Sequence, residues 1–392
     1  MATSNIAATN DFLNKLFMLF EEDGMMRCFY KLFKNQIEIF SPSELFLLSL
    51  IQDEYQKLYE QYYVKNCVTG TETLDRMLSD KYVVEMEESS QTDSLIVTYL
   101  HFIRADRQYF TKDFSGAIKN YKEACSRIKN DNCEKSFSDI DKERCAYLIN
   151  SIALSYMKRD HEKGYAKAIK LYKGMFIEFP DVDQYFFAWR YRRNYGVCLE
   201  NTNKYLDAIE QYEKAIDMPH KNNEYKLYLT YCSAIMKYWD RETGKLTGEW
   251  INNTKQLYKK SPYFSPESIA KIKKSLNLAN KHMRSKDLSS MLPDYYNQST
   301  KLLTYRIILS IRKTDRNRYI NEVKKNLKIL ETVSANALGR HYIARDFYYA
   351  MSKISSDQTE MKEYFQMAWN ENEIIDGKGD AKQFEKLLSY KS

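Results

Sequence analysis

Apolar positions recur in several segments of this chain at spacings of three and four residues, the period of an amphipathic helix. In SPSELFLLSLIQDEYQKLYEQYY (41–63), a long apolar face follows Ser41, Pro42 and Glu44. Ser at the N-cap, Pro at the first helical position and Glu at the third form a capping box, so a helix is predicted to begin at Pro42. Only 11 Gly and 6 Pro occur in 392 residues. Few helix breakers favour an all-α chain.

Two later segments carry similar apolar stripes. In the first, Ser265 is the expected N-cap and Pro266 the first helical position. The stripe residues are Ile269, Ile272, Leu276, Ala279 and Met283 in the first segment, and Ile320, Val323, Leu327 and Leu330 in the second. Basic side chains project from other faces of the first helix and form a candidate basic surface of Lys271, Lys274, Lys281 and Arg284.

One sequence pattern, an Ala-Ile pair followed by a tyrosine four residues after the alanine, occurs three times. The three copies of this repeated frame are FSGAIKNYKEAC (114–125), YAKAIKLYKGMF (165–176) and YLDAIEQYEKAI (205–216). In the third copy, Tyr212 and Ala215 follow Ala208 at i+4 and i+7, which places all three on one helix face. Gly196 lies twelve residues before Ala208, and Pro219 closes the segment. The equivalent residues are Ala117, Tyr121 and Ala124 in the first copy and Ala168, Tyr172 and Met175 in the second.

This pattern resembles the tetratricopeptide repeat (TPR). The shared features are small residues on two consecutive helices, an aromatic residue four positions after the second small residue, and a closing proline. The resemblance is clear over 95–220 and weaker towards 375, where Met361, Phe365 and Ala368 keep the spacing. It implies an all-α, right-handed superhelix of TPR-like helix-turn-helix repeats with an N-terminal helical portion. The expected divisions are an acidic portion at 1–90, repeats at 95–250, basic long helices at 251–340, and a degenerate repeat with a capping helix at 341–392. The polar segment 86–94 is the expected boundary loop.

The same resemblance implies which residues line the concave groove. The candidate groove residues are Tyr147, Asn150, Arg190, Arg193 and Asn194, and further groove positions fall on Phe102, Asp106, Ser151, Leu154, Val197 and Glu200. Arg190 and Arg193 are neighbours on one face and could hold a carboxylate or phosphate. The alternative is that both are solvated or paired with acidic residues of 1–90. A helical head joined to repeats is also similar to bacterial peptide-responsive regulators.

No motif in the sequence points to catalysis. HExxH, GxxxxGK[ST], GxGxxG and GxSxG do not occur, and the five histidines lack metal-ligand spacing. Seven cysteines, without a CxxC pair, are interpreted as reduced thiols. The prediction is a non-enzymatic adaptor or sensor that needs no cofactor and binds a protein or peptide, with an acidic segment as one candidate.

Charge leaves a second function open. Residues 251–340 contain 19 Lys and Arg against 6 Asp and Glu, whereas residues 1–90 contain 8 against 15. A basic segment of this kind favours nucleic acid or another acidic partner, or packing between the two oppositely charged parts. The sequence has no run of 18 apolar residues and no apparent secretory signal. A cytoplasmic protein without a membrane span is therefore expected.

Overall fold

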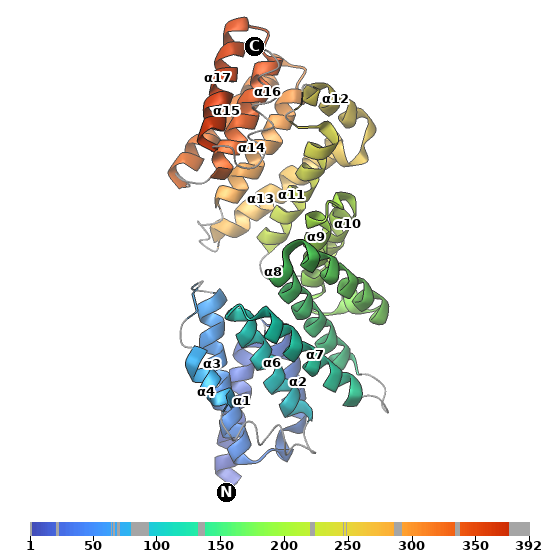
Figure 1. Cartoon of the computed structure of the whole chain (residues 1–392), viewed down its shortest axis with the longest axis vertical. Helices are drawn as coiled ribbons and strands as arrows, with labels where there is room; N and C mark the ends of the chain where they lie inside the picture. Colours follow the sequence, from blue (N-terminus) through green and yellow to red (C-terminus); the bar gives the residue numbers. More distant parts are fainter. Residues whose placement is uncertain are drawn as a thin grey trace. The chain divides into compact units, whose positions relative to one another are not determined.

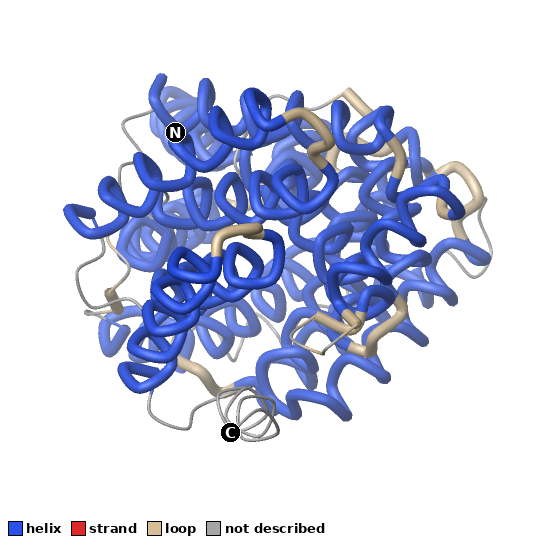
Figure 2. The backbone as a smooth tube through the Cα atoms, turned by 90° about the horizontal axis from the view of Figure 1, so that it is seen from above, coloured by secondary structure: helices blue, strands red, loops and turns tan. Residues whose placement is uncertain are grey.

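The computed structural model describes residues 2–20, 23–63, 65, 67–68, 71–79, 94–131, 138–219, 224–245, 247, 249–285, 292–333 and 338–375. Over these ranges the chain forms helices joined by turns, without a strand (Figure 2). The predicted all-α class is confirmed. None of the helices in the described ranges combines the length and the apolar character needed to cross a bilayer. The expected boundary loop at 86–94, except its last residue, and the tail after Gly377 lie outside the described residues.

The chain forms two compact units, Met1–Asn203 and Lys204–Ser392. The division falls directly before the third copy of the repeated frame, and the helices of 1–90 belong to the same unit as the first helix pairs. In the first unit the helices are α1 (Ala2–Phe20), α2 (Gly24–Gln36), η1 (Ile37–Ile39), α3 (Pro42–Tyr63), α4 (Thr71–Ser79), α6 (Ser94–Phe110), α7 (Phe114–Asp131), α8 (Asp139–Glu178), η2 (Val182–Gln184) and α9 (Ala188–Asn201) (Figure 1).

Side-chain caps mark the starts of α3 and α2. Glu44 accepts a hydrogen bond of 2.6 Å from the Ser41 backbone N–H, and the Ser41 hydroxyl accepts one of 3.3 Å from the Glu44 N–H. This is the predicted capping box at the start of α3. Asp23 caps α2 by accepting a hydrogen bond of 2.9 Å from the Met25 N–H. Helices α2 and α3 pack against α6, and α2 also packs against α8.

Helices α6 and α7 form an antiparallel pair, and α7 packs in turn against α8 (Figure 1). Helix α8 is assigned from Asp139 to Glu178, but His161 has non-helical dihedrals of φ 44° and ψ −118°. A Cβ placed on Gly164 would lie 2.0 Å from the carbonyl oxygen of Tyr156, eight residues earlier. Such close backbone approach requires the chain to reverse at His161, so α8 is a second helix pair.

The three non-glycine residues with positive φ in the described ranges are Lys112 (68°), His161 (44°) and Asn203 (61°). Each directly precedes one copy of the repeated frame. Lys112 and Asn203 lie five residues before Ala117 and Ala208. A residue with positive φ is a common way to end a helix and turn the chain. The repeated sequence frame therefore has a repeated backbone feature.

The apolar frame is buried in all three copies. All nine residues of the frame lie in the protein interior. They are Ala117, Tyr121 and Ala124, then Ala168, Tyr172 and Met175, then Ala208, Tyr212 and Ala215. Gly196 is buried as well. The weak terminal copy differs: Ala368 is buried, but Met361 is 37% exposed. The spacing of the repeated frame in that segment therefore does not reproduce the buried face of the three clear copies.

The second unit contains α10 (Tyr205–Asp217), α11 (Glu224–Thr243), α12 (Trp250–Lys260), η3 (Pro262–Phe264), α13 (Pro266–Ser285), α14 (Leu292–Leu309), α15 (Lys313–Val333), α16 (Leu338–Ile354) and α17 (Gln358–Ile375). Ser265 caps α13 as predicted, with its hydroxyl 3.3 Å from the Ser268 N–H. Both predicted apolar stripes face inward, except for Ile269, which is only partly buried. Val323, Leu327 and Leu330 pack with Phe347 in a core formed by α14, α15 and α16.

A charged cluster lies beneath the surface of the second unit. Asp240 of α11 accepts a hydrogen bond of 2.7 Å from the Tyr305 hydroxyl and forms an ion pair with Lys301. Lys245 lies 2.5 Å from Asp346 of α16 and 3.7 Å from Asp240. Burial opposes ionisation of Asp240, but Lys245, Lys301 and Tyr305 hold its pKa below the ordinary value. The cluster joins α11, α14 and α16 through paired charges.

Candidate functional site

A cavity of about 90 Å³ in the first unit is lined by the helices that the repeat frame assigns to the groove. Its walls come from α6, from the first half of α8 and from α9, and the end of α3 and one residue of α7 complete them. The lining residues are Tyr63, Asp106, Tyr109, Phe110, Tyr121, Tyr147, Asn150, Ser151, Leu154, Phe187, Arg190, Tyr191 and Asn194.

Four of the five candidate groove residues line this cavity: Tyr147, Asn150, Arg190 and Asn194. The fifth, Arg193, does not; its guanidinium lies 3.4 Å from the side-chain oxygen of Asn194. Of the further groove positions, Asp106, Ser151 and Leu154 also line the cavity. Phe102, which is completely buried, packs against aromatic rings instead. Thus α6, α8 and α9 converge on one space.

Two aromatic residues of the lining, Tyr63 and Phe187, could not be obtained from the repeat register. Tyr63 comes from α3, and its ring lies 5.6 Å from that of Phe110. Phe187 directly precedes α9 and approaches Gly24 of α2 so closely that a Cβ on Gly24 would lie 2.2 Å from its ring. Both residues reach the cavity through packing between the N-terminal helices and the helix pairs. No sequence spacing within one repeat encodes that packing.

Asn150 is held in one orientation by two donors. Its side-chain oxygen accepts hydrogen bonds of 2.9 Å from the Tyr172 hydroxyl and 3.0 Å from the Asn194 amide nitrogen. Because both bonds use the oxygen, the Asn150 amide nitrogen is left to donate towards the cavity. Within the described part of the chain it has no acceptor of its own. Arg193 donates to Asn194, and Asn194 donates to Asn150. Arg193 therefore supports the position of a lining residue without lining the cavity itself.

Arg190 is the one cationic side chain of the lining. Its guanidinium carbon lies 4.3 Å from the ring centroid of Phe187 and 5.4 Å from that of Trp189. Cation–π contacts of this kind restrain the guanidinium beside the two rings. Arg190 also lies near enough to Asp23 for its charge to lower the pKa of that carboxyl, against the larger effect of burial.

Two buried carboxyl groups, Asp23 and Asp106, meet at the hydroxyl of Tyr55. The Tyr55 oxygen lies 3.0 Å from Oδ2 of Asp23 and also forms a short contact with Oδ2 of Asp106. Tyr121 donates to the other oxygen of Asp106. The Tyr55 hydroxyl carries one hydrogen and can donate to only one carboxylate. For both contacts to be hydrogen bonds, one of the two carboxyl groups must be protonated and donate to the Tyr55 oxygen.

The pKa values of both carboxyl groups are raised, which also favours a protonated carboxyl group beside Tyr55. Burial raises the pKa of Asp106 well above its ordinary value, and the neighbouring charge of Asp23 raises it further, although hydrogen bonds from Tyr121 and Tyr55 oppose the shift. Burial also raises the pKa of Asp23, against hydrogen bonds from Tyr147, Met25 and Tyr55. Burial thus favours the protonated form of both carboxyl groups, Asp106 more strongly than Asp23.

The four residues of the candidate basic surface are all exposed on α13. Lys271 is engaged, because its ammonium lies 2.7 Å from a carboxylate oxygen of Glu213 on α10 and 5.5 Å from the ring centroid of Tyr231. Arg284 donates to the Asn280 side chain at 3.1 Å. Lys274 and Lys281 have no ion-pair partner in the described ranges. Part of the basic character expected for 251–340 is thus balanced inside the second unit.

No cluster of three or more His, Cys, Asp or Glu side chains suited to a metal ion occurs in the ranges that the structure describes. Six cysteines lie in these ranges and carry free thiols. Ser151, the one serine of the cavity, has no histidine beside it in the lining. The arrangement supplies hydrogen-bond donors, a cation and aromatic surface for binding.

Comparison of the sequence with protein-family models gives no match, and comparison with curated proteins gives none either.

Proposed function

We propose that the protein is a non-enzymatic adaptor or sensor, in which the face formed by α6, the first half of α8 and α9 binds a peptide or protein segment. In this proposal the helix pairs belong to a right-handed, TPR-like superhelix whose inner wall carries the site. The observation that carries the proposal is the cavity shared by these three helices. The repeated turn residues and the buried frame residues in all three copies support the repeat assignment.

The size of the cavity favours a side chain over a free small molecule. Sites for small molecules usually enclose about 300–1,000 Å³, whereas this cavity has about 90 Å³. One side chain of an extended segment would fill it, and the rest of the segment would lie along the helices. Tyr147, Phe187 and Tyr191 would supply most of the apolar contact area.

The polar groups favour a ligand that brings oxygen atoms. Arg190 brings a positive charge to the lining, and Asn150 offers its amide nitrogen. A peptide carboxylate would match the guanidinium, and a backbone carbonyl would match the amide. An acidic peptide is therefore the ligand that we propose. A cytoplasmic location is part of the proposal and is supported by the free thiols of the described cysteines.

A peptide selection tests this function. Random dodecapeptides displayed on phage would be selected on the purified chain, and enriched peptides would be titrated by isothermal calorimetry. We expect acidic residues to be enriched and Arg190→Gln to weaken binding by about tenfold or more, the range for loss of a charge-assisted hydrogen bond. Lys170→Gln is the matched control, because Lys170 is an exposed cation of the second half of α8. Equal affinities for the two variants would contradict the proposal.

Nucleic-acid binding remains the second candidate, because Lys274 and Lys281 project unpaired from α13 in the described ranges. Gel-shift titrations at several salt concentrations distinguish the two functions. Affinity that falls steeply with salt and is lost in Lys274→Glu/Lys281→Glu would favour nucleic acid. Peptide binding without any gel shift would favour the adaptor.

A further inference from the structure

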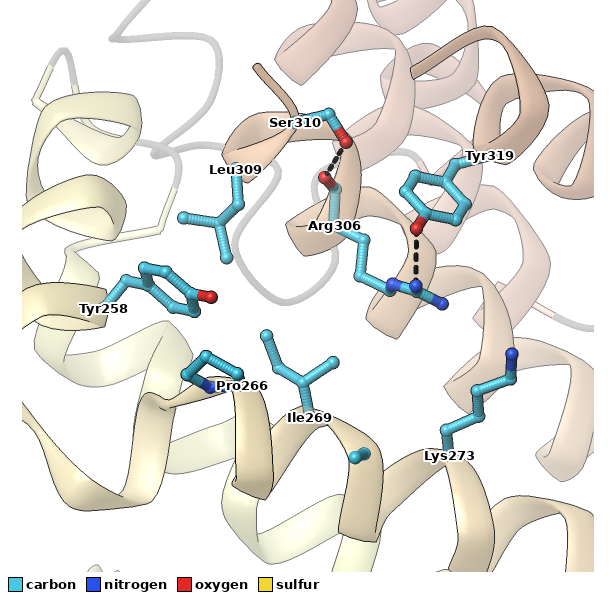
Figure 3. A pocket seen from close by; sticks show the side chains of 9 residues that line it. Tyr258, Pro266, Ile269, Lys273, Arg306, Leu309, Ser310 and Tyr319 are labelled. Carbon is cyan, nitrogen blue, oxygen red and sulfur yellow. Dashed lines mark hydrogen bonds between the residues drawn. The ribbon is translucent and has the colours of Figure 1, made fainter. Parts of the chain in front are cut away.

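A second, larger cavity lies in the second unit and belongs to none of the sites described above. It has a volume of about 330 Å³ and is bordered by α12, α13, α14 and α15. Figure 3 shows side chains from facing helices directed into this space, with apolar groups on one side and basic groups on the other. Its volume falls at the lower end of the range for small-molecule sites.

The apolar side of the cavity is formed by Tyr258, Pro266, Ile269 and Leu309 (Figure 3). Ile269 is the member of its stripe that is only partly buried. The other four stripe residues of α13 are buried in the protein interior. Ile269 and Leu309 thus offer hydrocarbon surface to this cavity, and a ligand could cover that surface.

The polar side offers donors and cations. Arg306 donates to the Tyr319 hydroxyl, and its guanidinium carbon lies 4.1 Å from the Tyr319 ring centroid. Arg318 donates to the same hydroxyl at 3.0 Å. The phenol oxygen therefore accepts two hydrogen bonds, and its own hydrogen has no acceptor in the part of the chain that the structure describes. Arg306, fixed by stacking and by this bond, keeps further N–H groups for a ligand.

Charge in the cavity is unbalanced. Lys273 and Arg306 both line it, and no Asp or Glu does. Within the described ranges neither cation forms an ion pair; Arg318, beside them, is paired with Asp315 at 3.3 Å. Figure 3 shows Lys273 and Arg306 reaching from α13 and α14 towards the same side of the space. Two unpaired cations beside a low-dielectric wall create a local positive potential that attracts an anion.

We propose that this cavity binds a small organic anion, which has one carboxylate or phosphate group on an apolar body. The anionic group is held by Lys273, Arg306 and the hydroxyl hydrogen of Tyr319. The apolar body lies against Ile269, Leu309 and Tyr258. A polar metabolite would leave the apolar wall uncovered, and a hydrocarbon without charge would leave the two cations unsatisfied.

The test uses the full chain and four probes: octanoate, octyl phosphate, octylamine and inorganic phosphate. Binding is measured by isothermal calorimetry at low salt. We expect octanoate, octyl phosphate or both to bind, and the stronger of the two identifies the anionic group. Octylamine and inorganic phosphate are expected to bind at least tenfold more weakly. If octylamine binds as well as the anions, or if neither octyl anion binds, the proposal is wrong.

Matched variants locate the binding. Lys273→Gln should weaken the octyl anion at least fivefold, whereas Lys274→Gln should change its affinity less than twofold. Both variants remove one exposed charge from the same helix, but only Lys273 lines the cavity. Ala270→Trp should block the cavity without changing charge, because Ala270 is an exposed lining residue. Equal loss in the two lysine variants, or full binding by Ala270→Trp with unchanged melting, would overturn the assignment.

Discussion

The Tyr172 hydroxyl donates a hydrogen bond of 2.9 Å to the side-chain oxygen of Asn150, 22 residues earlier in the same assigned helix. In a straight helix these residues would be about 33 Å apart at a rise of about 1.5 Å per residue. The bond therefore exists only because α8 reverses at His161. It also leaves the Asn150 amide nitrogen free to donate to a ligand. Tyr172, the aromatic residue of the second copy of the frame, thus connects the fold to the candidate site.

The close approach at Gly164 predicts a large effect of one methyl group. Gly164→Ala would place a Cβ 2.0 Å from the Tyr156 carbonyl oxygen, so the two halves of α8 would have to separate. We expect the free energy of unfolding, measured by urea denaturation, to fall by about 2–4 kcal/mol.

Gly174 provides the control in the same helix, because a Cβ there would meet no atom within 4 Å. Gly174→Ala should stabilise the protein by about 0.5–1 kcal/mol through helix propensity. Equal effects of the two substitutions would show that α8 does not reverse at His161.

The positive φ of Lys112 predicts a stabilising substitution. With φ at 68°, this residue adopts a conformation that glycine tolerates without a steric penalty. Lys112→Gly should raise the free energy of unfolding by about 0.5–1 kcal/mol. The exposed Lys119, in the interior of α7, is the comparison residue, and Lys119→Gly should cost about 1 kcal/mol. Thermal denaturation of both variants measures the expected opposite signs.

Local signals made much of this fold predictable. Ser41 with Glu44, and Ser265 with Pro266, mark helix starts through contacts within one turn. The frame around Ala117, Ala168 and Ala208 identifies buried faces because its period is that of a helix. Its register also led to seven residues that line the cavity.

Long-range packing was not predictable in the same way. Asp23, Tyr55 and Asp106 are separated by up to 83 residues, and only the packing of α2 and α3 against α6 brings them together. No sequence spacing indicates that these two carboxyl groups lie beside one tyrosine hydroxyl. The cavity in the second unit could not be predicted, because in the sequence its residues form an ordinary apolar stripe with basic neighbours. The unit boundary at Asn203 falls where the repeat pattern is most regular, so the sequence offers no composition change there.

The Asp23–Asp106 pair predicts that stability falls with rising pH. The folded-state pKa of Asp106 is raised, so the folded chain keeps a proton that the unfolded chain releases above its ordinary pKa of about 4. The free energy of unfolding should therefore decrease as pH rises through the interval between these two pKa values. Asp106→Asn resembles the protonated acid and should show a weaker decrease between pH 5 and pH 8.

Urea denaturation at several pH values measures this difference. Asp207→Asn, which removes an exposed carboxylate of α10, should retain the wild-type pH dependence. If Asp106→Asn and the wild type give parallel curves, Asp106 does not keep a proton in the folded chain and the account of this pair is wrong.

In the charged cluster of the second unit, removing one charge should destabilise the protein, and removing its partner as well should restore much of the stability. Asp240→Asn would leave Lys301 without its carboxylate partner, and the side chains are largely buried. We expect a cost of about 2–4 kcal/mol in the free energy of unfolding. The double variant Asp240→Leu/Lys301→Met should recover much of this loss, because no buried charge is left unpaired. Chemical denaturation of the single and double variants gives the coupling energy.

Photo-crosslinking of a selected peptide tests the central claim, that the α6–α8–α9 face binds a segment of another chain. A peptide carrying benzoylphenylalanine beside its acidic residue would be irradiated with the protein, and the linked residues identified by mass spectrometry. We predict crosslinks to residues around the cavity, such as Leu154, Tyr147 and Asn194, and their loss in Arg190→Gln. Crosslinks confined to α7 or to the second half of α8 would contradict the account.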